Sequence, residues 1–94
     1  MGYISKSEVL VWNKDNIDDA VANCGVYILR DSSKGMLYIG VSETALRESL
    51  LQHWNDKDIS DVVFFDWYET PDVKNAEDLA KTWINKYGPK NNKR

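Results

Sequence analysis

The hydrophobic residues of this chain gather in three continuous runs, and these runs predict three strands. Val, Ile, Leu and Tyr dominate residues 25–31 and 36–42, and residues 61–70 are rich in β-branched and aromatic side chains. Such runs are typical of strands. The polar sequence Asp-Ser-Ser-Lys-Gly joins the first two runs and is typical of a hairpin loop. We therefore expect a β-hairpin and, later in the chain, a third strand.

Elsewhere, apolar residues recur at helical spacing and predict three helices. We expect these helices over residues 13–22, 44–55 and 73–87. Ser42 and Thr44 are candidate caps for the second helix, and Gly88, followed by a proline, ends the third. The third helix carries three large apolar side chains on one stripe, which we expect in the core: Trp83, Ile84 and Tyr87.

The predicted order is helix, strand, strand, helix, strand, helix. It defines an α+β fold with a small three-stranded antiparallel sheet flanked by helices. A chain of 94 residues has room for one domain, so we expect a single domain over 1–94, with its core at about 12–92 and a polar tail at 90–94. Cys24 is the only cysteine, which excludes an internal disulfide. No apolar run approaches the roughly 20 residues of a membrane span, and we expect a cytoplasmic protein without membrane contact.

Charge limits the kind of partner. Twelve basic and fifteen acidic side chains give a formal charge of -3, so a strong, delocalised attraction to a phosphate backbone is not expected. Any contact with nucleic acid has to be local and weak. Solvated surface is the plainer interpretation of the clustered basic residues. The candidate nucleic-acid contacts are Lys34, Lys86, Lys90, Lys93 and Arg94.

Two tripeptides of the predicted hairpin each hold a tyrosine and a glycine: Gly25-Val26-Tyr27 and Tyr38-Ile39-Gly40. The helix after them reads LRESLLQH from Leu46, and the end of the chain contains AEDLA from Ala76 and PKNN from Pro89. In this order and spacing, the segments resemble the GIY-YIG nuclease superfamily. The resemblance covers about residues 12–92, nearly the whole chain. It implies the fold of a magnesium-dependent endonuclease in a small stand-alone domain.

The resemblance also implies which residues occupy the functional positions of the family. They are Tyr27, Tyr38, His53 and Asn92, with Gly25 and Gly40 as the motif glycines. In active members, a helix arginine contacts the scissile phosphate and a glutamate of the last helix holds the single divalent metal. This chain has Ser49 and Ala80 at those two positions.

The two departures predict a loss of catalysis. Phosphodiester cleavage adds negative charge to non-bridging oxygens, and a guanidinium and a metal ion stabilise that charge. Serine and alanine do neither. We therefore expect a domain that does not cleave, needs no cofactor and no metal, and acts as a binding or scaffolding module. Its partner is nucleic acid or protein, and the sequence leaves the oligomeric state open.

An alternative is an active, divergent nuclease that uses Mg or Mn. It would hold the metal with Glu77 or an acidic residue of 66–69, and would use a displaced arginine such as Arg30. Arg47 is a poor substitute, because at about 100° per residue it should point away from Ser49 and face solvent. Engineered substitutions at the two positions are a further alternative, although serine is an unusual choice for replacing arginine.

Each motif residue also has a plain structural interpretation. Tyr27 and Tyr38 are typical packing residues of a half-buried sheet. Glycines such as Gly25 and Gly40 permit a close approach of the backbone. A lone histidine such as His53 is more often a hydrogen-bonded edge residue than a ligand or base.

Overall fold

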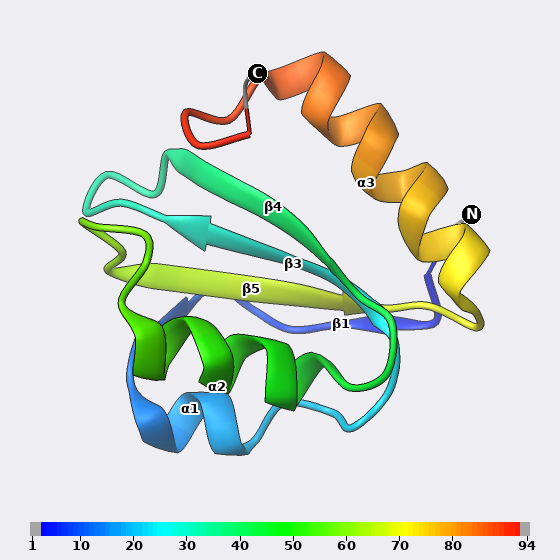
Figure 1. Cartoon of the computed structure of the whole chain (residues 1–94), viewed down its shortest axis with the longest axis horizontal. Coiled ribbons are helices and arrows are strands. Elements are labelled where there is room, and N and C mark those ends of the chain that lie inside the picture. The colour runs from blue at the N-terminus through cyan, green and yellow to red at the C-terminus, as the bar shows by residue number, and fades with distance from the viewer. Residues whose placement is uncertain (1–2, 93–94) are drawn as a thin grey trace.

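The computed structural model of the chain describes residues 3–92, which form one antiparallel sheet with helices on both faces (Figure 1). The elements are, in order, β1 (Ser5–Lys6), β2 (Leu10–Val11), α1 (Lys14–Asp18), β3 (Gly25–Arg30), β4 (Met36–Ser42), α2 (Leu46–Asp56), β5 (Phe64–Glu69) and α3 (Val73–Tyr87). The strand order is β1-β5-β3-β4, and β2 also pairs with β5. The helices α1 and α2 lie on one side of the sheet and α3 on the other.

The α+β class is confirmed, but the prediction of three strands is wrong because the sheet has five. β1 and β2 pair antiparallel with β5 along the edge that β3 leaves free. Each of these strands has two residues, too few for an alternating pattern to show in the sequence. Pairing with β5, more than fifty residues away, defines them.

The helices keep their predicted places but differ at their ends. The first helix is much shorter than the predicted 13–22, because α1 ends at Asp18. The caps predicted for α2 are wrong, since its N-cap is Ala45, which makes no side-chain bond, and Ser42 is the last residue of β4. α3 ends as predicted at Gly88, whose φ of 58° lies in the left-handed region. No helix among residues 3–92 is long and apolar enough to cross a membrane.

The sheet separates two hydrophobic clusters. The α2-face cluster consists of Ile17, Ala20, Tyr27, Leu29, Leu46, Leu50 and Phe65. The α3-face cluster consists of Val26, Ile28, Ile39, Ala76 and Ala80. Consecutive residues of β3 alternate between the two clusters, as the pleat of a strand requires. A side chain of α3 and the ring of Tyr27 therefore lie on opposite faces of the sheet.

The stripe predicted for the last helix is only partly in the core. Trp83 and Ile84 are half-buried against the α3-face cluster. Tyr87 is 51% exposed, so its prediction as a core residue is wrong. The physical reason is that Tyr87 lies over a pocket instead of packed side chains, at the point where the helix ends.

The end of the described chain is tied to β4, the edge strand of the sheet. The side-chain amide of Asn92 donates to the carbonyl oxygen of Ile39 at 2.9 Å, and its oxygen accepts from the Ile39 N–H at 2.7 Å. The backbone N–H of Asn91 donates to the Leu37 carbonyl oxygen at 2.7 Å. These bonds satisfy polar groups that an edge strand otherwise leaves unpaired.

Candidate functional site

Three of the family-equivalent residues meet on the α2 face of the sheet. Tyr27 comes from β3, Tyr38 from β4 and His53 from the last turn of α2. The Tyr27 hydroxyl oxygen lies 2.7 Å from Nε2 of His53. The centroid of the Tyr38 ring lies 6.1 Å from that of Tyr27 and 5.5 Å from that of His53. The two tyrosines and the histidine form one contiguous aromatic site.

A fourth residue, Asp58, extends this site and was missed by the sequence analysis. Its carboxylate lies 2.8 and 3.1 Å from Nδ1 of His53. A carboxylate only accepts hydrogen bonds, so Nδ1 donates to Asp58 and a neutral His53 accepts from the Tyr27 hydroxyl at Nε2. The loop that returns Asp58 to the helix begins at Lys57, which has a left-handed φ of 50°. No spacing of residues in the sequence predicts a contact of this kind.

The glycine of the second tripeptide makes room for the first tyrosine. Gly40 pairs with Tyr27 across β3 and β4. A Cβ at position 40 would overlap the Cζ and hydroxyl atoms of Tyr27 and would lie 2.8 Å from its Cε1. The ring therefore crosses the sheet directly over Gly40, and the two motif residues are matched in shape.

The environment of Tyr27 favours its protonated form. The residue is 4% exposed, and this burial raises the pKa of its phenol well above the ordinary value of 10.0. The proximity of Tyr38 and of the Asp58 carboxylate raises the pKa further. A tyrosine that acts as a base needs a lowered pKa, so this environment opposes such a role at neutral pH.

The raised pKa predicts a specific loss of stability in alkali. The folded protein holds the Tyr27 proton more tightly than the unfolded chain, so the free energy of unfolding falls as the pH rises above about 10. We expect a shallower fall in Tyr27→Phe, which has no phenol to ionise. Urea unfolding followed by tryptophan fluorescence at a series of alkaline pH values measures this slope. The matched control is Tyr87→Phe, at an exposed site, and it should keep the native slope; an unchanged slope in Tyr27→Phe would contradict the prediction.

The two substituted positions lie in different places. Ser49 lies on α2, one turn before His53, and its hydroxyl donates to the Ser42 hydroxyl oxygen at 2.8 Å. Ser42 is on the same face of β4 as Tyr38 and Gly40, so position 49 borders the site. Ala80 is 3% exposed within the α3-face cluster. The structure therefore brings position 49 to the tyrosines and leaves position 80 on the other face of the sheet.

The basic and acidic residues considered as substitutes do not join the site. Arg30 and Asp66 pair with each other, with Nε of Arg30 2.8 Å from the carboxylate, on the α3 face. Arg47 does not simply face solvent as predicted: it is half-buried, and its Nε donates to the carbonyl oxygen of Ala20 at 3.1 Å. Glu69 accepts from the side chains of Ser5 and Asn23. Glu77 is exposed on α3.

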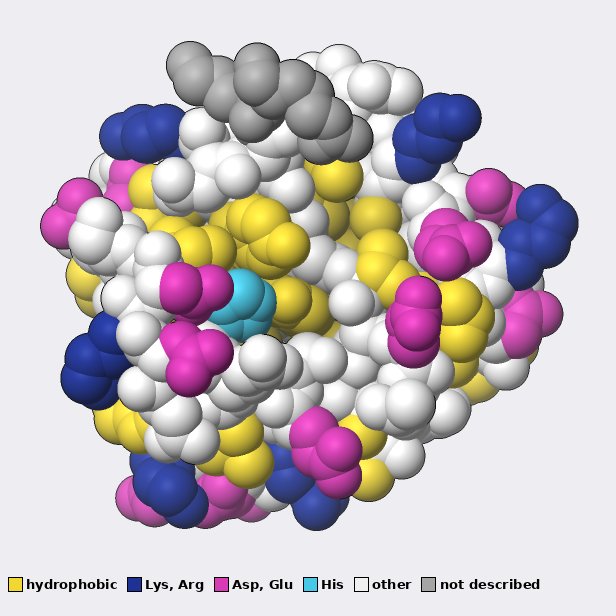
Figure 2. Space-filling view, viewed as in Figure 1, with side chains coloured by type: hydrophobic (Ala, Val, Ile, Leu, Met, Phe, Trp, Pro, Cys, Tyr) yellow, Lys and Arg dark blue, Asp and Glu magenta, His cyan; other side chains and the backbone are white. Residues whose placement is uncertain are grey.

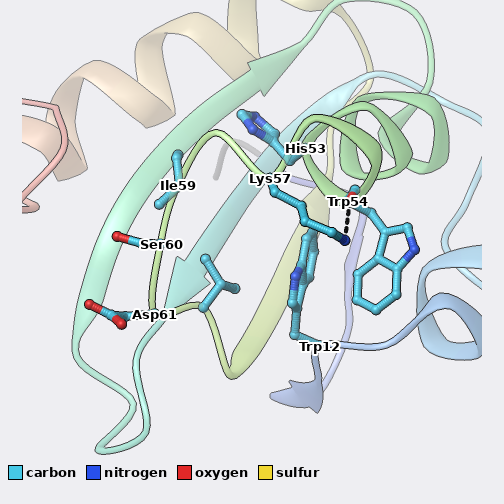
Figure 3. Close-up of a pocket in the computed structure, with 8 residues that line it drawn as sticks. Trp12, His53, Trp54, Lys57, Ile59, Ser60 and Asp61 are labelled. Atoms are coloured by element: carbon cyan, nitrogen blue, oxygen red, sulfur yellow. Dashed lines mark hydrogen bonds between the residues drawn. The ribbon is translucent and has the colours of Figure 1, made fainter.

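A cavity of about 370 Å³ opens beside the site, next to His53. Figure 3 shows the indole rings of Trp12 and Trp54 along one side and the loop of Ile59, Ser60 and Asp61 along the other. The side chain of Lys57 extends across Trp54 and donates to its carbonyl oxygen at 3.3 Å. The sequence analysis missed this cavity, because its walls come from a strand end, a helix end and a loop.

Acidic side chains lie beside the histidine on one side (Figure 2). The chain has one histidine, and Figure 2 shows Asp and Glu side chains directly beside it, with Lys and Arg toward the edges of this face. Asp58 is one of these acidic neighbours. The basic candidates have other contacts: Nζ of Lys34 lies 5.3 Å from the Phe64 ring centroid, and Nζ of Lys86 5.3 Å from that of Tyr87. Lys93 and Arg94 lie outside the described residues.

The sheet order and the helices on its two faces match the GIY-YIG fold, and the chain has this fold. Comparison with protein-family models and with curated proteins finds no match. Among solved structures, the chain is similar to the GIY-YIG N-terminal endonuclease domain of UvrC from Thermotoga maritima bound to magnesium. The identity is 22% and the TM-score 0.69, over 85% of this chain and 94% of that one. Two point mutants of that domain, each bound to its catalytic divalent cation, give 23% and 22% identity and TM-scores of 0.70 and 0.73, over 86% of this chain and 94% of theirs.

A divalent cation at this site would need a carboxylate beside the tyrosines. Mg²⁺ takes oxygen ligands, usually one or two carboxylates together with several waters. Among residues 3–92, no three His, Cys, Asp or Glu side chains gather in a group that could hold a metal ion. The carboxylate of Asp58 is bonded to His53, and the position where the resemblance implies a glutamate is the buried Ala80. The expectation that the domain needs no metal stays a prediction.

Proposed function

We propose that this chain is a GIY-YIG-fold domain that does not cleave phosphodiester bonds and acts as a binding or scaffolding module. The observation that carries the proposal is the pair of substitutions at Ser49 and Ala80. The Ser49 hydroxyl is bonded to Ser42, and Ala80 packs among aliphatic side chains. Neither can neutralise charge that develops on a phosphate.

The environment of Tyr27 supports the same proposal. A catalytic tyrosine has to orient or deprotonate a water molecule, and burial holds the pKa of Tyr27 above its ordinary value. The hydroxyl of Tyr27 is bonded to His53, and the histidine is bonded to Asp58. These three side chains stabilise one another, which is what a site retained for structure or recognition requires.

Charge supports a weak and local contact with nucleic acid, or a contact with a protein. The chain is acidic overall, and acidic side chains, Asp58 among them, lie beside His53 (Figure 2). Phosphate groups approaching the tyrosines would meet this negative potential. The proposed nucleic-acid contact therefore lies away from the site that nucleases of this fold use.

The proposal predicts that the native chain does not nick DNA or cleave RNA in the presence of Mg²⁺ or Mn²⁺. Supercoiled plasmid and labelled RNA are incubated with the full chain, and the products are separated on gels. If the native chain shows a trace of cleavage, Tyr27→Phe should show the same amount, because such cleavage comes from a contaminating nuclease. Cleavage that is abolished by Tyr27→Phe would contradict the proposal and restore the divergent nuclease.

A gain-of-function variant tests the reason for the loss. We expect Ser49→Arg with Ala80→Glu to nick plasmid in Mg²⁺ above the native level. Because Ala80 is buried in the α3-face cluster, a glutamate at position 80 has to leave that cluster and pass the edge strand β4 to meet the tyrosines. The matched control is Ser49→Arg with Ala80→Gln, which keeps the size of the side chain and removes its charge. Equal nicking by the glutamate and glutamine variants would show that a carboxylate at position 80 is not needed, and would contradict the role proposed for this position.

A further inference from the structure

A second pocket lies on the opposite face of the sheet from the tyrosine site. Its volume is about 200 Å³, and it is lined by Ile28, Arg30, Met36, Tyr68, Trp83 and Tyr87. We name it the α3-face pocket. It forms where the last turns of α3 meet the hairpin end of β3 and β4. The size is sufficient for one planar ring system.

Aromatic side chains form the walls of the α3-face pocket. The rings of Tyr68 and Trp83 meet edge to face, with centroids 4.7 Å apart and an interplanar angle of 67°. Tyr87 lies one helical turn beyond Trp83 and is 51% exposed. An exposed tyrosine beside a half-buried tryptophan offers a stacking surface that the core itself does not use.

Two lysines lie near the same pocket, Lys86 at the end of α3 and Lys34 in the loop between β3 and β4. Nζ of Lys86 lies 5.3 Å from the Tyr87 ring centroid, and the carbonyl oxygen of Lys34 accepts from the Arg30 guanidinium at 3.0 Å. Nζ of Lys34 lies over Phe64, which pairs with Arg30 across the sheet. Asp66, which lies opposite Ile28 in the sheet, is paired with Arg30. The two lysine charges are therefore not cancelled by that carboxylate.

We propose that the α3-face pocket binds an unpaired base of single-stranded nucleic acid, with Tyr87 stacking on the base and Lys86 and Lys34 contacting the flanking phosphates. Aromatic side chains combined with lysines are the common basis of single-strand binding. Duplex bases are stacked on each other and cannot enter a pocket of this size. The inference rests on the proposed non-cleaving function and names its ligand class. It also places nucleic-acid binding on the opposite face of the sheet from the tyrosine site.

The test is fluorescence anisotropy of the full chain with labelled oligothymidylate, oligouridylate and a duplex hairpin at several salt concentrations. We expect the single strands to bind more tightly than the duplex, with affinity falling as salt rises. Tyr87→Ala should weaken single-strand binding about fivefold or more, and Tyr87→Phe should retain it. Lys86→Ala should weaken binding and reduce the salt dependence by about one phosphate contact.

Two controls address the position of the site. Lys74→Ala removes the same charge from the other end of α3, where the lysine is exposed and pairs with Asp78, and it should bind like the native chain. Lys14→Ala removes an exposed charge from α1, on the other side of the sheet, and should also leave binding unchanged. Thermal unfolding verifies that each variant is folded.

Several results would overturn the inference. They are native-like binding by Tyr87→Ala and Lys86→Ala, an equal loss in Lys74→Ala, equal affinity for duplex, or no binding of any oligonucleotide. Tyr87-dependent binding of an acidic phosphotyrosine peptide in place of the oligonucleotides would assign the pocket to a protein partner. None of these results involves cleavage, so the proposed non-cleaving function would be judged separately by the nicking assay.

Discussion

Gly25→Ala is expected to lower the free energy of unfolding by about 3 kcal/mol or more, at the upper end of what overpacking costs. Gly25 lies in β3 between its partners Ser42 and Glu69. A Cβ there would overlap the backbone carbonyl oxygen of Tyr68 and lie 2.9 Å from Cδ1 of Leu46. Since the first obstacle is backbone, a side-chain rotation cannot relieve it, and β3 has to separate from β5. Urea unfolding monitored by tryptophan fluorescence measures the change.

Gly35→Ala is the matched control for Gly25→Ala. The Cβ at position 35 would lie 3.2 Å from an oxygen of the Asp31 carboxylate, in an exposed loop. The contact is with a side chain and not with the backbone, and a shift of a few tenths of an ångström relieves it, so we expect a loss below about 1 kcal/mol. Similar losses in the two variants would show that β3 and β5 do not approach as closely as this packing requires.

Arg30→Met is expected to cost about 3–5 kcal/mol, because it leaves a buried carboxylate without its counter-charge. The side chain of Asp66 is 5% exposed and that of Arg30 is 16% exposed. The guanidinium bonds to both carboxylate oxygens, at 2.8 and 3.3 Å. The double variant Arg30→Met with Asp66→Leu should recover most of the loss, since two apolar side chains can replace a buried ion pair.

An exposed ion pair provides the control for this experiment. Lys74 and Asp78 are paired on the surface of α3, with side chains that are 84% and 67% exposed. Lys74→Ala should change the free energy of unfolding by no more than about 0.5 kcal/mol. If the double variant were as unstable as Arg30→Met alone, the loss would come from packing of the arginine side chain and not from the unpaired charge.

The elements with strong local signals were predicted closely. The second strand was predicted at 36–42 and is observed over Met36–Ser42. A short, continuous apolar run between polar turns is typical of a strand, so its bounds could be predicted from the sequence. The last helix ends at Gly88 as predicted, since glycine adopts the left-handed conformation without steric cost. The sequence also resembled the GIY-YIG superfamily, and the solved structures agree on the fold.

The errors share a physical cause. β1 and β2 exist because β5 has a free edge, and Tyr87 is exposed because a pocket lies beneath it. The N-terminus of α2 lacks its predicted side-chain cap because Ser42 is used to end β4 and bond to Ser49. Each outcome depends on a neighbour distant in the sequence or on competition between two elements, and local periodicity carries neither kind of information.

The sequence by itself determined the α+β order, the paired tyrosines and the absence of arginine and glutamate at positions 49 and 80. Only the tertiary structure decided that Tyr27 bonds to His53, that His53 bonds to Asp58, and that Ala80 lies on the other face of the sheet. The physical reason is that residue identity and backbone preference are local properties. Which side chains meet depends on how helices cover the two faces of the sheet, and this packing is set by the whole chain at once.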